Sequence, residues 1–305
     1  MRNTFADTFF EAAKADPRLC AVVADISPAG SMAKFREAFP DRFINTGVAE
    51  QIMIGIVAGM ALRGLKPFAY TIATFALFRP YEFVRDDLCY QNLPVTVVGI
   101  GGGVTYSTLG ATHHALEDIG LASTLPNMQV IAPCDPSEVR EATRWCAAQN
   151  NGPVYLRLGK AGEPVLTQDA DAWQFGKLRF LRRGRDVCLL TYGPITKTAI
   201  DVADRLAAKG KTVSVASVHT LKPLDRAGIA AALEAHGRVA VIEEMLPNGG
   251  LSLRVKEIAL DLGTRPRVDC FTLKDEFLHN YGSHAQVLAA HGLSADAILA
   301  RLESP

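Results

Sequence analysis

Short apolar runs that alternate with stretches of helical periodicity constrain the fold of this chain more than any other feature. Residues 19–24, 94–100 and 186–191 are largely apolar, whereas apolar side chains recur at helical spacing in stretches such as 50–62 and 136–148. Short apolar runs without alternation are typical of strands that are buried on both faces. Because helices must cover those faces, the pattern predicts an α/β fold with mostly parallel sheets.

The pattern is interrupted once. The chain has 305 residues, which is longer than one usual domain, and a polar, acid-rich stretch lies near residues 163–173. We therefore expect two domains, each a mostly parallel sheet flanked by helices, over residues 1–165 and 184–305. A linker over residues 166–183 would join them.

The expected elements can be placed along both halves. Strands are predicted at 19–24, 67–74, 94–100, 130–132, 186–191, 212–218, 238–243 and 267–271. Helices are predicted at 3–15, 50–62, 80–90, 136–148, 194–208, 225–236 and 250–262.

The composition argues against several classes of partner. The chain carries 32 basic and 32 acidic residues, so no net charge favours nucleic acid or a membrane surface. The longest uncharged apolar run is too short to span a bilayer, and the first residues lack the apolar core of a secretory signal. The six cysteines are scattered without a Cys-x-x-Cys pair. We expect a cytoplasmic protein without disulfides or a metal site of its own.

Glu50 and a nearby group of aromatic residues are the first candidates for a site. Glu50 heads the apolar stretch 50–62, and Phe75, Phe78 and Tyr81 follow at even spacing. A carboxylate that enters an apolar environment beside aromatic faces suits a flat, weakly basic heterocycle. Two simpler interpretations stay open, because an acid at a helix N-terminus can serve the dipole and an aromatic stripe can be core.

Two further motifs give weaker evidence for a site. The glycines of residues 99–103 follow a predicted strand but match neither dinucleotide-binding nor P-loop spacing. His113 and His114 are adjacent, so they lack the i, i+4 spacing of helical zinc ligands.

Taken together and in order, four strings resemble a known family. They are Thr-Gly-Val-Ala-Glu-Gln (46–51), Thr-Phe-x-x-Phe-x-x-Tyr (74–81), Gly-Ala-Thr-His-His-x-Leu-Glu-Asp (110–118) and Leu-Pro-Asn-Met (125–128). So arranged, they resemble the pyrimidine-binding domain of the transketolase family of thiamine diphosphate enzymes. Residues 185–193 and 241–244 are similar to that family's C-terminal domain, so the resemblance covers nearly the whole chain.

The resemblance implies a cofactor site around Glu50. In the family a glutamate at this place hydrogen-bonds N1′ of the aminopyrimidine of thiamine diphosphate and shares its proton. The aromatic residues matched by Phe75, Phe78 and Tyr81 form the pocket of that ring. Asp25 matches a family acid close to the cofactor and to the subunit contact, although a cap or turn role is equally open.

The resemblance also implies substrate contacts. His113 matches a histidine that binds sugar hydroxyls and moves protons, a role that suits its ordinary pKa near neutrality. Lys160 and Arg2 fall where the family holds the terminal phosphate of a sugar. Lysine is a point charge where the family's arginine is a bidentate fork.

The chain departs from the family in three places. Leu109 stands where full-length transketolases carry an acid, and Gly101 lies near the place of a second histidine, so the usual pentose phosphates are in doubt. No Gly-Asp-Gly occurs anywhere, although the family binds diphosphate and Mg²⁺ through that motif. We therefore expect the C-terminal subunit of a split transketolase, in an α₂β₂ assembly whose N-terminal subunit holds Mg²⁺ and the diphosphate.

The sequence also leaves three alternative functions open. The first is the β subunit of a 2-oxoacid dehydrogenase, and the second is an enzyme similar to deoxyxylulose-phosphate synthase. A regulatory or scaffolding subunit without chemistry is the third.

Overall fold

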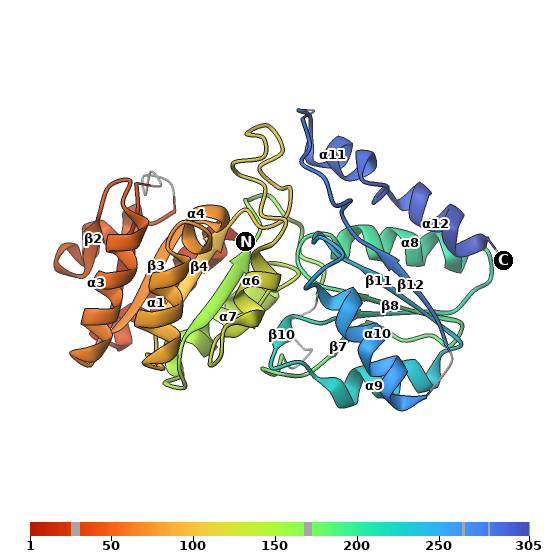
Figure 1. The fold of residues 1–305 in the computed structure, drawn as a ribbon, viewed down its shortest axis with the longest axis horizontal. Coiled ribbons are helices and arrows are strands. Elements are labelled where there is room, and N and C mark those ends of the chain that lie inside the picture. The colour runs from red at the N-terminus through yellow and green to blue at the C-terminus, as the bar shows by residue number, and fades with distance from the viewer. Residues whose placement is uncertain (26–30, 168–172, 264–265, 280, 305) are drawn as a thin grey trace.

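The computed structural model describes residues 1–25, 31–167, 173–263, 266–279 and 281–304. They form two α/β units that lie side by side (Figure 1). The first unit contains a seven-stranded sheet in the order β10-β5-β6-β4-β3-β1-β2, and the second a five-stranded sheet in the order β12-β11-β8-β9-β7. Neighbouring strands are parallel except β10 with β5 and β7 with β9. The predicted fold class, with two mostly parallel sheets, is confirmed.

The first sheet and its helices come almost entirely from the N-terminal half. Its strands are β1 (Leu19–Val23), β2 (Phe43–Asn45), β3 (Lys66–Ile72), β4 (Thr96–Ile100), β5 (Gln129–Ile131), β6 (Val154–Leu158) and β10 (Thr220–Lys222). Its helices are α1 (Arg2–Ala15), α2 (Ala33–Ala38), the 3₁₀ turn η1 (Pro40–Arg42), α3 (Glu50–Leu62), α4 (Ala73–Leu77), α5 (Tyr81–Phe83), the π-helical segment η2 (Val84–Tyr90), α6 (Asp118–Thr124) and α7 (Pro136–Ala148).

The second sheet is built from later residues. Its strands are β7 (Arg179–Arg182), β8 (Val187–Thr191), β9 (Val213–Ser217), β11 (Arg238–Ile242) and β12 (Arg267–Phe271). Its helices are α8 (Thr196–Ala208), α9 (Arg226–Ala235), α10 (Leu251–Leu262), α11 (His284–Ala290) and α12 (Ala295–Glu303). Within the described residues, no helix combines the length and the apolar character that crossing a membrane requires.

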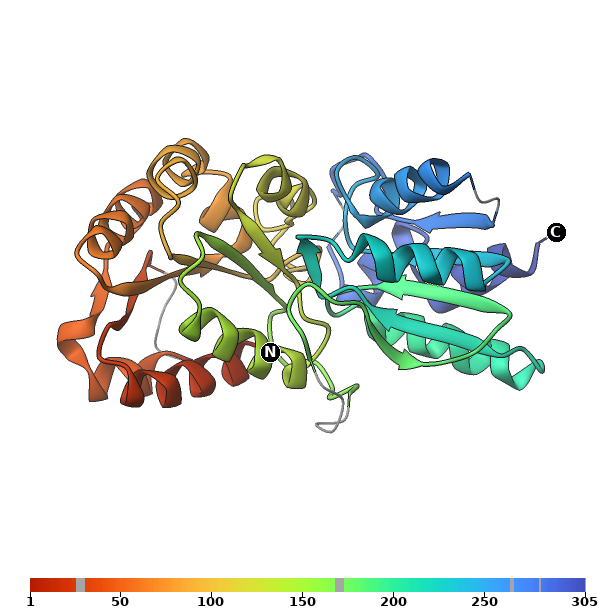
Figure 2. The same ribbon diagram turned by 90° about the horizontal axis from the view of Figure 1, so that it is seen from below.

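Helices cover both faces of the first sheet. Helices α1 and α7 lie on one face, and α3, α4 and α6 lie on the other (Figure 2). Successive side chains of β1 alternate between these layers, since Val22 packs in the cluster on the α3 side while Ala21 and Val23 pack in the cluster on the α1 side. This two-sided burial explains why the strand is apolar at every position.

The strongest sequence signals predicted element bounds well. Helices α3 and α7 have the bounds expected at 50–62 and 136–148. Helix α7 starts sharply because the Asp135 side chain accepts the N–H of Glu138 at 2.9 Å and Pro136 occupies the first turn.

Other expectations need correction. The strand predicted to reach residue 74 ends at Ile72, because α4 starts at Ala73. The stretch 80–90 is helical but divides into α5 and the π-helical η2. Strand β6 was not predicted, and its run contains Tyr155 and Arg157.

The two halves are joined more closely than a simple linker would require. Strand β7 lies inside the stretch 166–183 yet pairs with β9, and residues 168–172 lie outside the described residues. Strand β10 comes from the second half but pairs with β5 of the first sheet. The boundaries 1–165 and 184–305 remain a prediction, and we propose that the second unit begins by residue 179.

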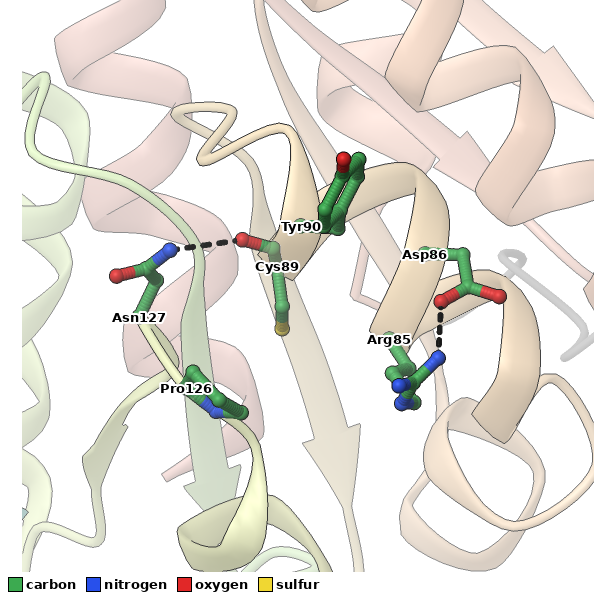
Figure 3. Close-up of a pocket in the computed structure, with 6 residues that line it drawn as sticks. All are labelled: Arg85, Asp86, Cys89, Tyr90, Pro126 and Asn127. Atoms are coloured by element: carbon green, nitrogen blue, oxygen red, sulfur yellow. Dashed lines mark hydrogen bonds and ion pairs between the residues drawn. The ribbon is translucent and has the colours of Figure 1, made fainter.

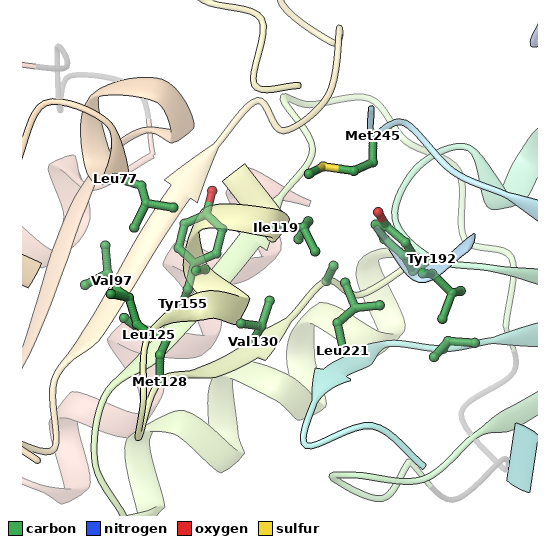
Figure 4. Packing of buried hydrophobic residues seen from close by; sticks show 14 of the residues in the cluster. Leu77, Val97, Ile119, Leu125, Met128, Val130, Tyr155, Tyr192, Leu221 and Met245 are labelled. Carbon is green, nitrogen blue, oxygen red and sulfur yellow. The ribbon is translucent and has the colours of Figure 1, made fainter. Parts of the chain in front are cut away.

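A buried network crosses between the units. The guanidinium of Arg157 pairs with Asp118 at 2.8 Å, and its Nη2 donates to the carbonyl oxygen of Glu244 at 3.0 Å. Around this network one hydrophobic cluster runs from Leu77 in the first unit to Tyr192 in the second (Figure 4). The site described below therefore rests on a rigid, shared core.

Candidate functional site

Predicted site residues follow the carboxyl ends of successive parallel strands in the first sheet. Asp25 follows β1, Glu50 follows β2, Phe75 follows β3, His113 follows β4 and Lys160 follows β6. In open α/β sheets, ligands bind in the crevice outside these strand ends. The fold therefore brings residues from separate segments to one edge of the sheet.

Glu50 is a buried carboxylate at the start of a helix. It is the first residue of α3 and is only 2 % exposed. The preceding turn is held by Asn45, whose side-chain oxygen accepts the N–H groups of Gly47 at 3.0 Å and Asp25 at 3.2 Å. Gly47 has a φ of 68°, which glycine adopts without steric cost. The carboxylate lies at the positive end of the α3 dipole.

Arg79 makes a contact with Glu50 that the sequence did not predict. Its Nη1 donates to Oε2 of Glu50 at 2.8 Å, and its guanidinium carbon lies 4.9 Å from the centre of the Phe75 ring. The Arg79 side chain is 42 % exposed, so it reaches the buried carboxylate from the surface. The only sequence hint was its position next to Phe78 in the aromatic segment.

His113 lies next to Phe75. The two rings meet edge to face, with centres 5.2 Å apart. The Thr112 hydroxyl is hydrogen-bonded to Nδ1 of His113 at 2.9 Å, which leaves Nε2 available for a substrate. Burial lowers the pKa of His113. The ring is therefore neutral at pH 7 and can accept a proton from a hydroxyl group.

Phe78 and Tyr81 are half-buried against the core on the α3 side of the sheet. The Tyr81 hydroxyl donates to the carbonyl oxygen of Leu121 at 3.1 Å and lies 2.8 Å from the Thr124 hydroxyl. These contacts tie α5 to α6. Any role of Tyr81 toward a ligand would therefore fall to its ring, because its hydroxyl is engaged.

Lys160 and Arg2 meet at Tyr106, which the sequence did not single out. The Lys160 ammonium lies 5.3 Å from the centre of the Tyr106 ring, and the His113 ring lies 6.1 Å from it. Burial raises the pKa of Tyr106, while the charge and hydrogen bond of Arg2 oppose the rise. Lys160 and His284 also line a pocket of about 340 Å³ between the units. Tyr106 is thus a common neighbour of Lys160, Arg2 and His113.

The structure gives a reason for one departure from the family pattern. Gly101 has a φ of 82°, and a Cβ atom there would lie 2.0 Å from the Tyr106 ring. Tyr106 therefore fills the space that a side chain at residue 101 would need. Leu109 is 47 % exposed, and His114 is buried.

A separate small pocket does not belong to this site. It has a volume of about 140 Å³ and lies between η2 and the loop after α6 (Figure 3). Asn127 donates to the carbonyl oxygen of Cys89 at 3.0 Å. Burial raises the pKa of the Cys89 thiol to about 12, so the thiol is unreactive at neutral pH. No predicted site residue lines this pocket.

The side chains around Glu50 suit an aromatic heterocycle better than a metal. A buried carboxylate can accept a hydrogen bond, and Phe75, which contacts the same Arg79 side chain, offers a flat face. In the part of the chain that the structure describes, no three histidine, cysteine or acidic side chains gather closely enough to hold a metal ion.

Comparisons with known protein families match both units. The transketolase pyrimidine-binding domain matches residues 1–162. The transketolase C-terminal domain matches residues 176–298. Together the two families account for most of the chain, in the order that the two sheets follow.

Several known proteins are similar over the whole chain. One subunit of the apulose-4-phosphate transketolase of Actinobacillus succinogenes is 32 % identical over 299 residues, covering 98 % of this chain and 96 % of that protein. A 1-deoxy-D-xylulose-5-phosphate synthase of Azoarcus is 34 % identical over 304 residues, but the chain spans only 48 % of its length. A solved structure described as a split-gene transketolase, an inactive beta4 tetramer, is 31 % identical with a TM-score of 0.88, covering 99 % of this chain and 96 % of that one.

Proposed function

The chain belongs to the transketolase family, and from this premise we propose that it is the C-terminal subunit of a two-subunit transketolase. It would transfer a two-carbon ketol unit between sugar substrates that carry a phosphate. The observation that carries the proposal is the buried Glu50 carboxylate at the start of α3, which Arg79 links to Phe75, whose ring in turn meets the His113 ring. Thiamine diphosphate, when bound, supplies a carbon acid that stabilises negative charge during C–C bond cleavage and formation.

Glu50 and the aromatic residues would hold the aminopyrimidine. A Glu50 carboxyl oxygen would share a proton with the ring nitrogen N1′, and the low exposure of Glu50 keeps water from competing for that proton. Phe75 and Phe78 would pack against the ring, with Tyr81 as support. Asp25, which follows β1 at the same edge, would lie near the cofactor and the subunit contact.

His113 and the two cations would act on the sugar. Nε2 of His113 would accept a proton from a substrate hydroxyl and return it, because its lowered pKa keeps the ring neutral. Lys160 and Arg2 would attract the phosphate, and both are neighbours of Tyr106, whose ring also contacts that of His113. Lysine would hold the phosphate less rigidly than arginine.

A partner subunit would complete the site. The sequence contains no Gly-Asp-Gly, so Mg²⁺ and the diphosphate would be held by another polypeptide. An exposed apolar face on the site helix supports a contact with another chain: Ile52 is 60 % and Leu62 62 % exposed, and Gly55 and Gly59 lie between them. We propose an α₂β₂ assembly in the cytoplasm.

The known proteins support a range of sugars. The Actinobacillus relative is named for apulose 4-phosphate and has nearly the length of this chain. The similarity to 1-deoxy-D-xylulose-5-phosphate synthase keeps that activity as the second candidate. The replacements at Leu109 and Gly101 favour a sugar other than the usual pentose phosphates.

Co-expression with the partner tests the proposal. The purified complex should transfer a ketol unit among sugar phosphates only when thiamine diphosphate and Mg²⁺ are present. Glu50→Gln should lower kcat by about 10²–10⁴-fold, the range of proton-transfer catalysis, while the complex still assembles. Near-normal turnover in that variant would refute the proposed role of Glu50. Activity of the isolated chain would refute the proposal that two subunits share the active site. Formation of 1-deoxy-D-xylulose 5-phosphate as the only product would favour the second candidate.

A further inference from the structure

Arg79 uses the same two groups that a cofactor ring would need. We propose that Arg79 is a cofactor-site residue that competes with the aminopyrimidine for Glu50 and Phe75, and so sets how tightly the assembled enzyme holds thiamine diphosphate. The inference rests on the proposed function. Arg79 lies within the string 74–81, at a position that the family resemblance leaves unspecified.

The geometry of Arg79 is the first support. One nitrogen of its guanidinium donates to Glu50 at 2.8 Å, and the guanidinium carbon lies 4.9 Å from the centre of the Phe75 ring. A guanidinium is flat, carries N–H donors and stacks on aromatic faces. An aminopyrimidine shares the flatness and would need the same carboxylate and the same face. The two groups therefore exclude one another at this place.

The charge of Arg79 is the second support. Its Nη1 places a cation 2.8 Å from Oε2 of the buried Glu50 carboxylate. The proposed role of Glu50 requires that its carboxyl group share a proton with N1′. The ion pair with Arg79 must therefore break before the carboxyl group can face N1′.

The position of Arg79 allows it to leave. It lies between α4, which ends at Leu77, and α5, which starts at Tyr81. Its side chain is 42 % exposed, while that of Glu50 is 2 % exposed. A long side chain rooted at the surface can turn into solvent without disturbing the core. Glu50, in contrast, is held by its helix.

Cofactor titration of the assembled enzyme tests the competition. Arg79→Met keeps much of the apolar stem but removes the charge and the donors. We expect this variant to lower the Kd for thiamine diphosphate by about three- to tenfold. The expected change is modest because a half-exposed ion pair contributes only about 1 kcal/mol of free energy, and a tenfold change in Kd corresponds to about 1.4 kcal/mol. The matched control is Arg85→Met, which removes an exposed arginine paired with Asp86 on η2 and should leave the Kd unchanged. Isothermal titration with Mg²⁺ present gives both values without a turnover assay.

A second variant protects the test against misfolding. Arg79→Lys keeps a cation but not the flat, forked donor group, so it should bind the cofactor more tightly than wild type by a smaller factor. Unchanged or weaker binding in a folded Arg79→Met or Arg79→Lys complex would overturn the inference while leaving the proposed function intact. No thiamine diphosphate binding by the wild-type complex would overturn both.

Discussion

Replacing Arg157 with leucine should destabilise the chain strongly. Arg157 is 3 % exposed and Asp118 is fully buried, and the two are paired at 2.8 Å. The same guanidinium also donates to the carbonyl oxygens of Ala115 at 3.3 Å and Glu244 at 3.0 Å. Leucine would therefore leave the Asp118 charge without its cation, and two buried carbonyl oxygens without the guanidinium donor.

The expected magnitude follows from the uncompensated charge. Removing one partner of a buried ion pair costs about 3–5 kcal/mol, because the remaining charge is desolvated. We expect a loss of about 4 kcal/mol in the free energy of unfolding. The double variant Arg157→Leu/Asp118→Leu removes both charges and should recover at least about 2 kcal/mol of that loss, although the Tyr155 hydroxyl then loses its acceptor.

Urea unfolding of the purified chain, followed by circular dichroism and by tryptophan fluorescence, measures these changes. The matched control is Arg144→Leu, which removes an exposed ion pair with Glu141 on α7 and should change stability by less than about 1 kcal/mol. Because the guanidinium also bonds to the second unit, the two probes should report separate transitions in Arg157→Leu. A single variant within about 1 kcal/mol of wild type, or a double variant as unstable as the single one, would refute the reasoning.

Three further outcomes are expected. His113→Asn should lower kcat by about 10²–10⁴-fold. Because burial lowers the pKa of His113, wild-type turnover should persist as the pH falls below 6.5 and should decline only when the pH falls through that lowered pKa. A decline that starts well above pH 6.5 would contradict this. Lys160→Met should raise KM about tenfold for phosphorylated sugars, and an equal rise for unphosphorylated ones would count against phosphate binding. Burial acts to lower the pKa of His284, but the Glu244 carboxylate at 3.0 Å has the larger effect, so this pKa is raised. Burial acts to raise the pKa of Glu244, but the charge and hydrogen bond of His284 have the larger effect, so this pKa is lowered. The pair should therefore stabilise the fold fully between about pH 4.5 and 6.5. This stabilisation should decrease as the pH rises through the raised pKa of His284 or falls through the lowered pKa of Glu244. The His284→Asn variant should therefore show a flatter pH dependence of the urea midpoint.

Local signals made part of the fold predictable from the sequence. Helix α7 has a side-chain cap at Asp135 and a proline in its first turn, so its start was visible in a few residues. Strand β1 is apolar at every position because helices cover both of its faces. These features depend on neighbours in the chain, and the sequence displays them directly.

Contacts between distant residues were not predictable in the same way. Strand β6 contains Arg157, which resembles a surface residue until Asp118, far away in the chain, neutralises it. Arg79 is an ordinary arginine in a loop, and only the fold brings it to Glu50. The ordered motifs identified the family but not the residues that modify its site. Their roles, including those of Glu50, Phe75 and His113, remain predictions for the experiments above.

The pairing of β10 with β5 has a consequence for how the protein folds during synthesis. Residues 220–222 complete the first sheet, although the rest of that sheet ends at residue 158. While the ribosome has made only the first half, β5 is an open edge that can pair with other chains. A fragment that ends near residue 165 would keep that edge exposed. The first unit therefore reaches its protected form only after the second half has emerged.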